Sequence, residues 1–173
     1  TIFRNGEQKA ISVTLAPFVP LVPNIHYFEE PSYYIFGGLV FSVLSEDLIN
    51  ELFEIYRMDG QLDTYTAFIS MAPLLSYQEG VRSYKTPTRR EIVILLRVLE
   101  DDVNAGYEAV LEIVSKVNDK PVSTFKELVT TLHFQEGSYA VIDTEANTKI
   151  ILETAAAKAA NSSAPTVRLE AMR

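Results

Sequence analysis

Hydrophobic and polar positions change their spacing along the chain, and each spacing predicts a type of element. In residues 11–15, isoleucine, valine and leucine alternate with serine and threonine, which is the two-residue period of a β-strand. Asn5-Gly6 lies between this segment and residues 2–4, and Asn-Gly is a favoured pair for a type I′ hairpin turn. The pattern therefore predicts a β-hairpin at the N-terminal end.

Nearly continuous apolar runs predict buried strands further along the chain. Residues 91–99 (EIVILLRVL) and 109–117 (AVLEIVSKV) have few polar positions, as is typical of strands covered on both faces. Residues 25–41 are aromatic and β-prone and contain Gly37-Gly38, which predicts a tight turn or exposed N–H donors between two strands. Further strands are predicted at residues 39–43, 139–143 and 149–153, the last two joined by a turn at 145–147.

Helical spacing appears in two amphipathic segments. Ser45 followed by two acids opens the first, which is expected to end near residue 57 with Leu48, Ile49, Leu52, Phe53 and Tyr56 on its apolar face. Ser123 is expected to cap the second, whose apolar face is Phe125, Leu128, Val129 and Leu132. A short helix at 64–71 that ends before Pro73, a helical turn near Asp101 and an alanine-rich helix at 154–160 complete the prediction.

This order of elements predicts an α+β fold, a partial β-barrel of five to six strands capped by two helices, with an additional N-terminal β-hairpin. Three prolines between residues 16 and 24 favour an extended segment that separates the hairpin from the rest. Residues 76–90 are expected to form a loop. The last dozen residues carry little periodicity and are expected to form a mobile tail.

Composition and charge narrow the classes of function. A chain of 173 residues with 47% hydrophobic residues is long and apolar enough to bury a core. The net charge of −8, with Arg89-Arg90 as the main basic feature, argues against nucleic acid as a partner. No cysteine is present for disulfides or zinc, and no apolar run reaches the roughly 20 residues of a membrane span. The first residue is Thr1 rather than methionine, which suggests a processed product or a fragment.

Catalytic and metal chemistry are weakly supported. A serine protease needs Ser, His and Asp around an oxyanion hole, but the two histidines lie in an aromatic loop (His26) and at a helix end (His133), and a Gly-x-Ser-Gly-Gly turn is lacking. Glu29-Glu30 and Asp101-Asp102 are adjacent carboxylates, which are usually solvated or lie at helix N-termini. The spacing of Asp101, Asp102 and Asn104 does not fit a calcium loop. No catalytic residue, metal or cofactor is therefore predicted.

Several motifs resemble those of a PDZ domain of the Deg/HtrA protease family. GGLVF (residues 37–41) is similar to the family's carboxylate-binding loop, VSKVNDKPV (114–122) to a strand and turn, and residues 123–132 to the groove helix. PSYYIFGGLVF (31–41) and LEDDVNAGY (99–107) resemble the second PDZ domain of plant Deg proteases and their bacterial relatives. Val40 replaces a second glycine of the common loop and Asp119 replaces the usual glycine of the turn, and the first departure weakens the expectation of tight C-terminus binding.

The resemblance implies a non-catalytic interaction module of a trypsin-like serine endopeptidase, which acts in oligomer assembly, regulation or binding of substrate segments. A peptide would add as a strand beside residues 39–43. The residues implied for this site are Phe36, Gly37, Gly38, Leu39, Val40, Phe41, Phe125, Leu128, Val129 and Leu132. The implied partners are protease and PDZ domains of the same or neighbouring subunits in a homo-oligomer, and substrate peptides. A bacterial parent would be periplasmic or otherwise exported.

The resemblance also implies domain boundaries. Residues 1–16 would be the C-terminal hairpin of a preceding PDZ domain, 17–30 a linker, 31–160 the PDZ-like domain with an insertion at 61–90, and 161–173 a tail. The insertion's apolar side chains (Tyr65, Phe68, Met71, Leu74, Leu75 and Tyr77) either cover the sheet or form a patch for a partner. Two rival functions stay open, a stand-alone peptide-binding receptor or scaffold and an enzyme that uses the carboxylates near Asp101.

Overall fold

The computed structural model describes residues 1–14, 18–23, 32–58, 64–78 and 82–161. The expectations for His26, Glu29-Glu30, the strand before Ser32 and most of the tail lie outside the described residues.

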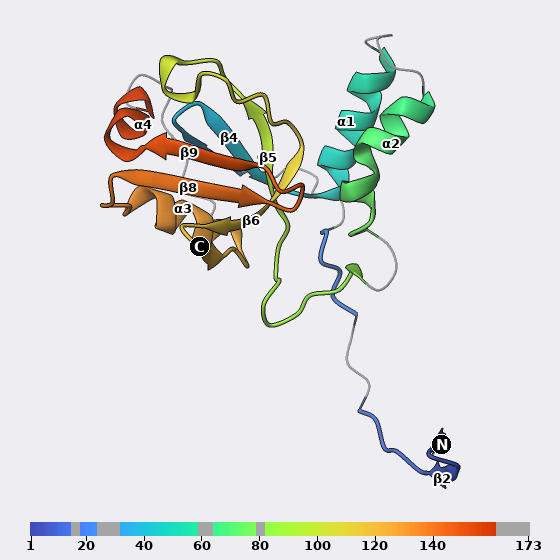
Figure 1. Ribbon diagram of the computed structural model, residues 1–173. Helices are drawn as coiled ribbons and strands as arrows, with labels where there is room; N and C mark the ends of the chain where they lie inside the picture. The colour runs from blue at the N-terminus through green and yellow to red at the C-terminus, as the bar shows by residue number, and fades with distance from the viewer. Residues whose placement is uncertain (15–17, 24–31, 59–63, 79–81, 162–173) are drawn as a thin grey trace.

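The larger sheet confirms the predicted α+β class (Figure 1). It is antiparallel and open, and its strands follow the order β3 (Tyr33–Phe36), β4 (Leu39–Val43), β5 (Val93–Val98), β6 (Glu112–Val117), β8 (Tyr139–Thr144) and β9 (Lys149–Glu153). A seventh, two-residue strand, β7 (Lys120–Pro121), pairs with β6 after a turn in which Asn118 and Asp119 both have positive φ. With this short strand the sheet has seven strands, one more than the upper limit of the expected five to six.

The helical elements that lie wholly within the described residues are α1 (Glu46–Met58), α2 (Thr64–Leu75), the 3₁₀ turn η2 (Asp102–Asn104), α3 (Phe125–His133) and α4 (Thr154–Asn161). Ser45 Oγ accepts a hydrogen bond from the Leu48 N–H, as the first predicted cap requires. No helix of the described residues is long and apolar enough to cross a membrane.

Two helix boundaries differ from the prediction. Thr124, not Ser123, caps α3, because its backbone is extended (φ −143°, ψ 157°) and its Oγ1 accepts the Glu127 N–H. Helix α2 does not end before Pro73 but continues to Leu75. A proline this close to the end removes one hydrogen bond near the last turn, where few residues follow to be disturbed.

Two hydrophobic cores lie on the sheet. The main core joins β3, β4, β5, β6, β8 and β9 with α3 and Ala157 of α4. The second core packs α1 and α2 against Ile92, Ile94 and Ile113 (Figure 1). Met71, Leu74 and Tyr77 are buried there, so the described part of the insertion's apolar side covers the sheet. Leu21 and Val22, within the expected linker, are buried in the same core.

The second strand of the N-terminal hairpin is formed by other residues than predicted. Strand β1 (Ile2–Arg4) pairs with β2 (Glu7–Lys9) across Asn5-Gly6, where both residues have positive φ. This turn pairs Arg4 with Glu7 and Ile2 with Lys9, so the segment that faces β1 is 7–9 and not 11–15. Residues 11–14 therefore lie outside the two strands, and every residue from 1 to 14 is exposed.

Candidate interaction site

The glycine turn joins β3 and β4 as a two-residue hairpin. Phe36 faces Leu39, and Gly37 and Gly38 between them have φ of +55° and +78°. Positive φ at both central residues is the requirement of a type I′ turn. A Cβ on Gly38 would lie 2.4 Å from the Leu99 carbonyl oxygen and 2.2 Å from Asn104 Nδ2. The turn therefore needs glycine for both its conformation and its close neighbours.

Asn104 holds this turn from one side. Its side chain is buried, and Nδ2 donates to the carbonyl oxygens of Gly37 (2.8 Å) and Leu99 (2.7 Å), while Oδ1 accepts the Asp101 N–H (3.1 Å). Asp101 caps η2 by accepting the Val103 N–H. The carboxylate pair near Asp101 thus opens a 3₁₀ turn that carries Asn104 to the glycines. Among the described residues, no group of three or more His, Cys, Asp or Glu side chains could hold a metal ion.

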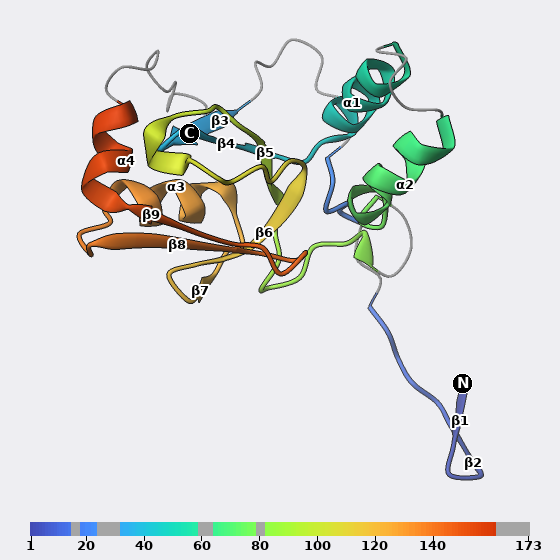
Figure 2. The same cartoon turned by 45° about the horizontal axis from the view of Figure 1, so that its top comes forward.

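Asn161, the last residue of α4, holds the turn from the other side. The Gly37 N–H donates to Asn161 Oδ1 (2.9 Å), and Asn161 Nδ2 donates to the Ile35 carbonyl oxygen (2.8 Å). Ala157, one turn earlier, is fully buried and lies so close that a Cβ on Gly37 would come within 2.9 Å of its Cβ. Helix α4 contacts both β3 and β9, the two ends of the sheet (Figure 2). Sequence reasoning considered Asn104 only as a poorly spaced calcium ligand, and it did not single out Asn161.

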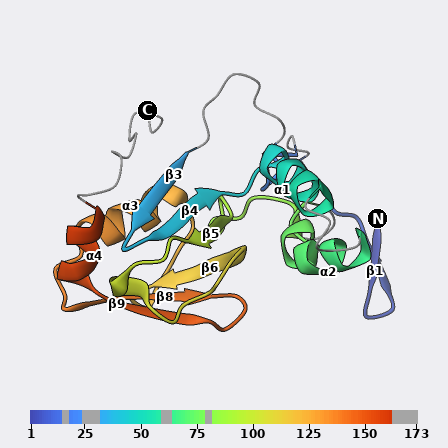
Figure 3. The ribbon, with the colours of Figure 1, turned by 90° about the horizontal axis from the view of Figure 1, so that it is seen from above.

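Strand β4, beside which a peptide was expected to add, is paired on both edges. Residues 39–42 face β3, and residues 39–43 face β5. Figure 3 shows β3 and β5 on either side of β4. A free peptide can take a place beside β4 only if β3 leaves it.

The predicted groove residues lie together in the main core. Leu128 and Leu132 of α3 are fully buried, Phe125 and Val129 are 5% and 4% exposed, and all four belong to the core cluster that contains Phe36, Leu39 and Phe41. Val40 is 8% exposed. The structure thus brings the predicted side chains of α3, β3 and β4 together, with little of their surface open to solvent.

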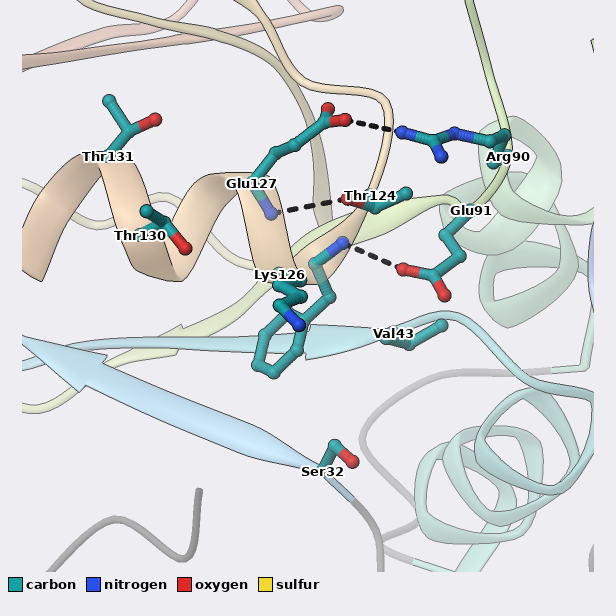
Figure 4. A pocket seen from close by; sticks show the side chains of 10 residues that line it. Ser32, Val43, Arg90, Glu91, Thr124, Lys126, Glu127, Thr130 and Thr131 are labelled. Carbon is teal, nitrogen blue, oxygen red and sulfur yellow. Dashed lines mark hydrogen bonds and ion pairs between the residues drawn. The ribbon is translucent and has the colours of Figure 1, made fainter. Parts of the chain in front are cut away.

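A cleft of about 620 Å³ lies between the first turns of α3 and the ends of β3 and β4 (Figure 4). Ser32 and Val43 line its strand side, and Lys126, Thr130 and Thr131 line its helix side. The remaining walls are the loop residues Arg90 and Glu91 and the helix-start residues Thr124, Phe125 and Glu127.

Charged side chains fix the start of α3 at this cleft. Glu91 accepts the Phe125 N–H (2.7 Å), so it satisfies a free donor and places a negative charge at the positive end of the helix dipole. Glu127 pairs with Arg90 and also accepts the Ser123 N–H. The Arg90–Glu127 pair is half exposed, and such pairs contribute about 0–1 kcal/mol to stability.

A second polar cluster ties the insertion to the sheet. The Tyr77 hydroxyl donates to Glu145 (2.7 Å) and accepts from Arg82 (2.6 Å), and the guanidinium carbons of Arg82 and Arg89 lie 4.4 and 5.0 Å from the Tyr77 ring centroid. Burial and the Glu145 carboxylate raise the pKa of Tyr77 to about 12, although the two arginines act in the opposite direction. Burial also raises the pKa of Tyr34. The cluster thus joins Tyr77, which follows α2, to Glu145 in the turn after β8.

Comparison with known proteins places these features in a family. The sequence model of the PDZ domain matches residues 22–164. "Protease Do-like 2, chloroplastic" of Arabidopsis thaliana is 35% identical over 161 residues, which is 92% of this chain and 24% of that protein. "Putative protease Do-like 3, mitochondrial" of the same plant is 31% identical over 73% of the chain and 19% of its own length. "Serine protease DegP homolog" of Plasmodium falciparum is 27% identical over 74% of the chain and 13% of its own length. The chain thus spans about a quarter or less of these curated relatives.

Proposed function

Because the chain belongs to the PDZ domain family and is the PDZ region of a Deg/HtrA-like protein, we propose that it is a non-catalytic module for assembly and regulation of a serine protease. The relatives are named as proteases, whereas this chain is a PDZ domain and not a protease domain. The parent would be a trypsin-like endopeptidase, and this chain would bind rather than hydrolyse.

One observation carries the choice of assembly over free-peptide reception. Strand β4 is hydrogen-bonded to β3 and β5, and the Gly37 N–H is bonded to Asn161 of the same chain. Strand addition needs a sheet edge with unpaired N–H and C=O groups, and β4 does not offer one. In this proposal the predicted groove side chains of α3, β3 and β4 pack against one another in the main core instead of contacting a free peptide.

The domain boundaries form part of the same proposal. Residues 1–16 would complete a preceding PDZ domain, because the apolar side chains of Ile11 and Val13 are 52% and 73% exposed. Residues 17–30 would link that domain to the PDZ domain at 31–160, with residues 161–173 as a tail. The neighbours of the module would then be protease and PDZ domains of its own oligomer.

The test measures two properties. The first is the oligomer size of the full-length parent, measured by mass photometry with and without residues 22–164. The second is the binding of this chain to a pool of octapeptides with free C-termini. Loss of the oligomer on deletion, with peptide affinity weaker than about 1 mM, supports the proposal. An unchanged oligomer refutes it, and sub-millimolar peptide binding would favour the stand-alone peptide receptor instead.

A further inference from the structure

The outer edge of β3 is the strand edge nearest the glycine turn. In the antiparallel β3–β4 pair, Phe36 and Tyr34 face Leu39 and Phe41, and the closing pair of a two-residue hairpin exchanges both of its hydrogen bonds. Alternate residues of a strand direct their backbone groups to opposite edges, so Tyr33 and Ile35 point theirs away from β4. The Ile35 carbonyl confirms this direction, because it accepts from Asn161 on that side.

The Asn161 side chain does at this edge what one residue of a neighbouring strand would do. A residue in a strand parallel to β3 donates its N–H to the carbonyl of one β3 residue and accepts, through its C=O, the N–H two residues later. Asn161 donates to the carbonyl of Ile35 and accepts the N–H of Gly37, in that order. Its carboxamide has the same donor and acceptor as a peptide group. A side chain of the domain thus occupies one position that a residue of a parallel strand would fill.

We infer that the outer edge of β3 is a strand-addition site for an extended peptide that runs parallel to β3, and that Asn161 closes this site in competition with the peptide. The inference rests on the proposed role as an interaction module and specifies which edge of the domain that role uses. The peptide's C-terminal part takes the position of Asn161, so that a peptide carbonyl or a terminal carboxylate accepts the Gly37 N–H.

The cleft at the start of β3 indicates which charge suits the peptide side chain that lies beside Ser32, ahead of the residue beside Phe36. Ser32 lines the cleft, and the peptide residue beside Ser32 lies four positions before the one beside Phe36. Of the four charged residues in the lining, Arg90 pairs with Glu127 and Glu91 accepts the Phe125 N–H. Lys126 is exposed and has no hydrogen-bond or ion-pair partner within the described part of the chain. An acidic residue at this upstream position therefore fits the site better than a basic one.

The experiment measures peptide binding by ¹⁵N-labelled chains that differ at Asn161. The probe is a degenerate octapeptide pool, synthesised once with free C-termini and once as C-terminal amides, with either Glu or Lys fixed four positions before the last residue. Asn161→Leu removes both hydrogen bonds. Asn161→Asp is nearly isosteric and keeps only the acceptor for Gly37. Ala155→Leu, at an exposed position of the same helix, is the matched control.

We expect Asn161→Leu to bind the Glu pool about tenfold more tightly than the wild-type chain, a change of about 1.4 kcal/mol, with Asn161→Asp in between and Ala155→Leu unchanged. Amide shifts should centre on Tyr33, Ile35 and Gly37, and the Gly37 amide should exchange faster in Asn161→Leu without peptide. If the free-acid and amide pools bind equally, the site accepts internal segments of a protein. If the free acids bind more tightly, the site accepts C-termini. Both outcomes support the inference.

Three results would overturn the inference. In the first, Asn161→Leu binds the peptide pool with the same affinity as the wild-type chain, and its Gly37 amide exchanges at the same rate. In the second, the amide shifts caused by the peptide centre on β9 instead of β3. In the third, Ala155→Leu gains as much peptide affinity as Asn161→Leu. If Asn161→Leu does not fold, Asn161→Asp decides, because it changes one donor without changing the size of the side chain. Each of these results leaves the oligomer size of the parent unaffected, so that failure of this inference is distinguishable from failure of the proposed function.

Discussion

Replacement of Gly38 by alanine tests the packing of the glycine turn. The added Cβ would lie 2.4 Å from the backbone oxygen of Leu99 and 2.2 Å from Asn104 Nδ2, with φ at +78°. Asn104 can shift only by giving up its bonds to the Gly37 and Leu99 carbonyls. Leu99 cannot shift freely, because its N–H donates to the Gly38 carbonyl and it follows directly after β5.

The expected loss is the sum of three terms. A non-glycine residue in the left-handed region costs roughly 1–2 kcal/mol. Crowding in a well-packed region adds about 1–3 kcal/mol, and a weakened buried hydrogen bond adds about 1 kcal/mol. We therefore expect Gly38→Ala to lower the free energy of unfolding by about 3–6 kcal/mol. For a chain of this size the melting temperature should fall by roughly 6–24 °C.

Gly106 supplies the matched control. Its φ is +88°, close to that of Gly38, but a Cβ there meets nothing within 4 Å. Gly106→Ala should therefore lose only the conformational term of about 1–2 kcal/mol. Urea denaturation followed by far-UV circular dichroism gives both values, provided that the m-values match. Equal losses in the two variants would refute the argument, because they would mean that Asn104 and Leu99 yield to a methyl group without cost.

Three further substitutions probe the rest of the site. Asn104→Ala should lower the free energy of unfolding by about 2–4 kcal/mol in urea, because it leaves buried carbonyls unpaired, and a loss under 1 kcal/mol would contradict this. Leu128→Glu should abolish folding rather than weaken peptide binding alone, since the side chain is fully buried; a native circular dichroism spectrum would show otherwise. Tyr77→Phe should lose about 1 kcal/mol at pH 7. Because the pKa of Tyr77 rises from 10.0 to about 12 on folding, wild-type stability from this group is complete below pH 10 and lost as the pH rises through 12. Urea titrations at several pH values should show that Tyr77→Phe lacks this loss of stability at high pH. If stability depends on pH in the same way in Tyr77→Phe and the wild-type chain, the loss does not come from Tyr77.

Burial left a visible mark on the elements that pack on the cores. Strands β5 and β6 lie within the nearly continuous apolar runs, which are typical of strands covered on both faces. Helix α3 follows the apolar spacing of three to four residues and ends one residue beyond the predicted segment. The hairpin's second strand was misplaced because alternation identifies a strand but not its register. The two-residue turn sets the register, and here it pairs Glu7–Lys9 with β1.

The residues that close the site could not be predicted in the same way. Asn104 and Asn161 are single polar residues, and their hydrogen-bond partners Gly37 and Ile35 lie 67 and 124 to 126 positions away. Neither asparagine belongs to a periodic pattern, and both are compatible with an ordinary loop or helix end. The useful signal in the sequence was the glycine pair, which indicated a special backbone but not which groups contact it.

The position of β3 decides which peptides this domain is able to bind beside β4. Strand β3 buries Tyr34 and Phe36, and exposing each side chain would cost about 1.5–3 kcal/mol. A free peptide that displaced β3 could regain this energy only by presenting similar side chains in the same register. Even then β3 is tethered through Gly37-Gly38, and a short tether gives an effective concentration in the millimolar range or above. The effective concentration of β3 is therefore about a thousand times that of a competing peptide at micromolar concentration, and β3 occupies the position beside β4. The pairing of β3 with β4 therefore disfavours a free peptide beside β4, and this is the reason for placing the proposed peptide at the outer edge of β3.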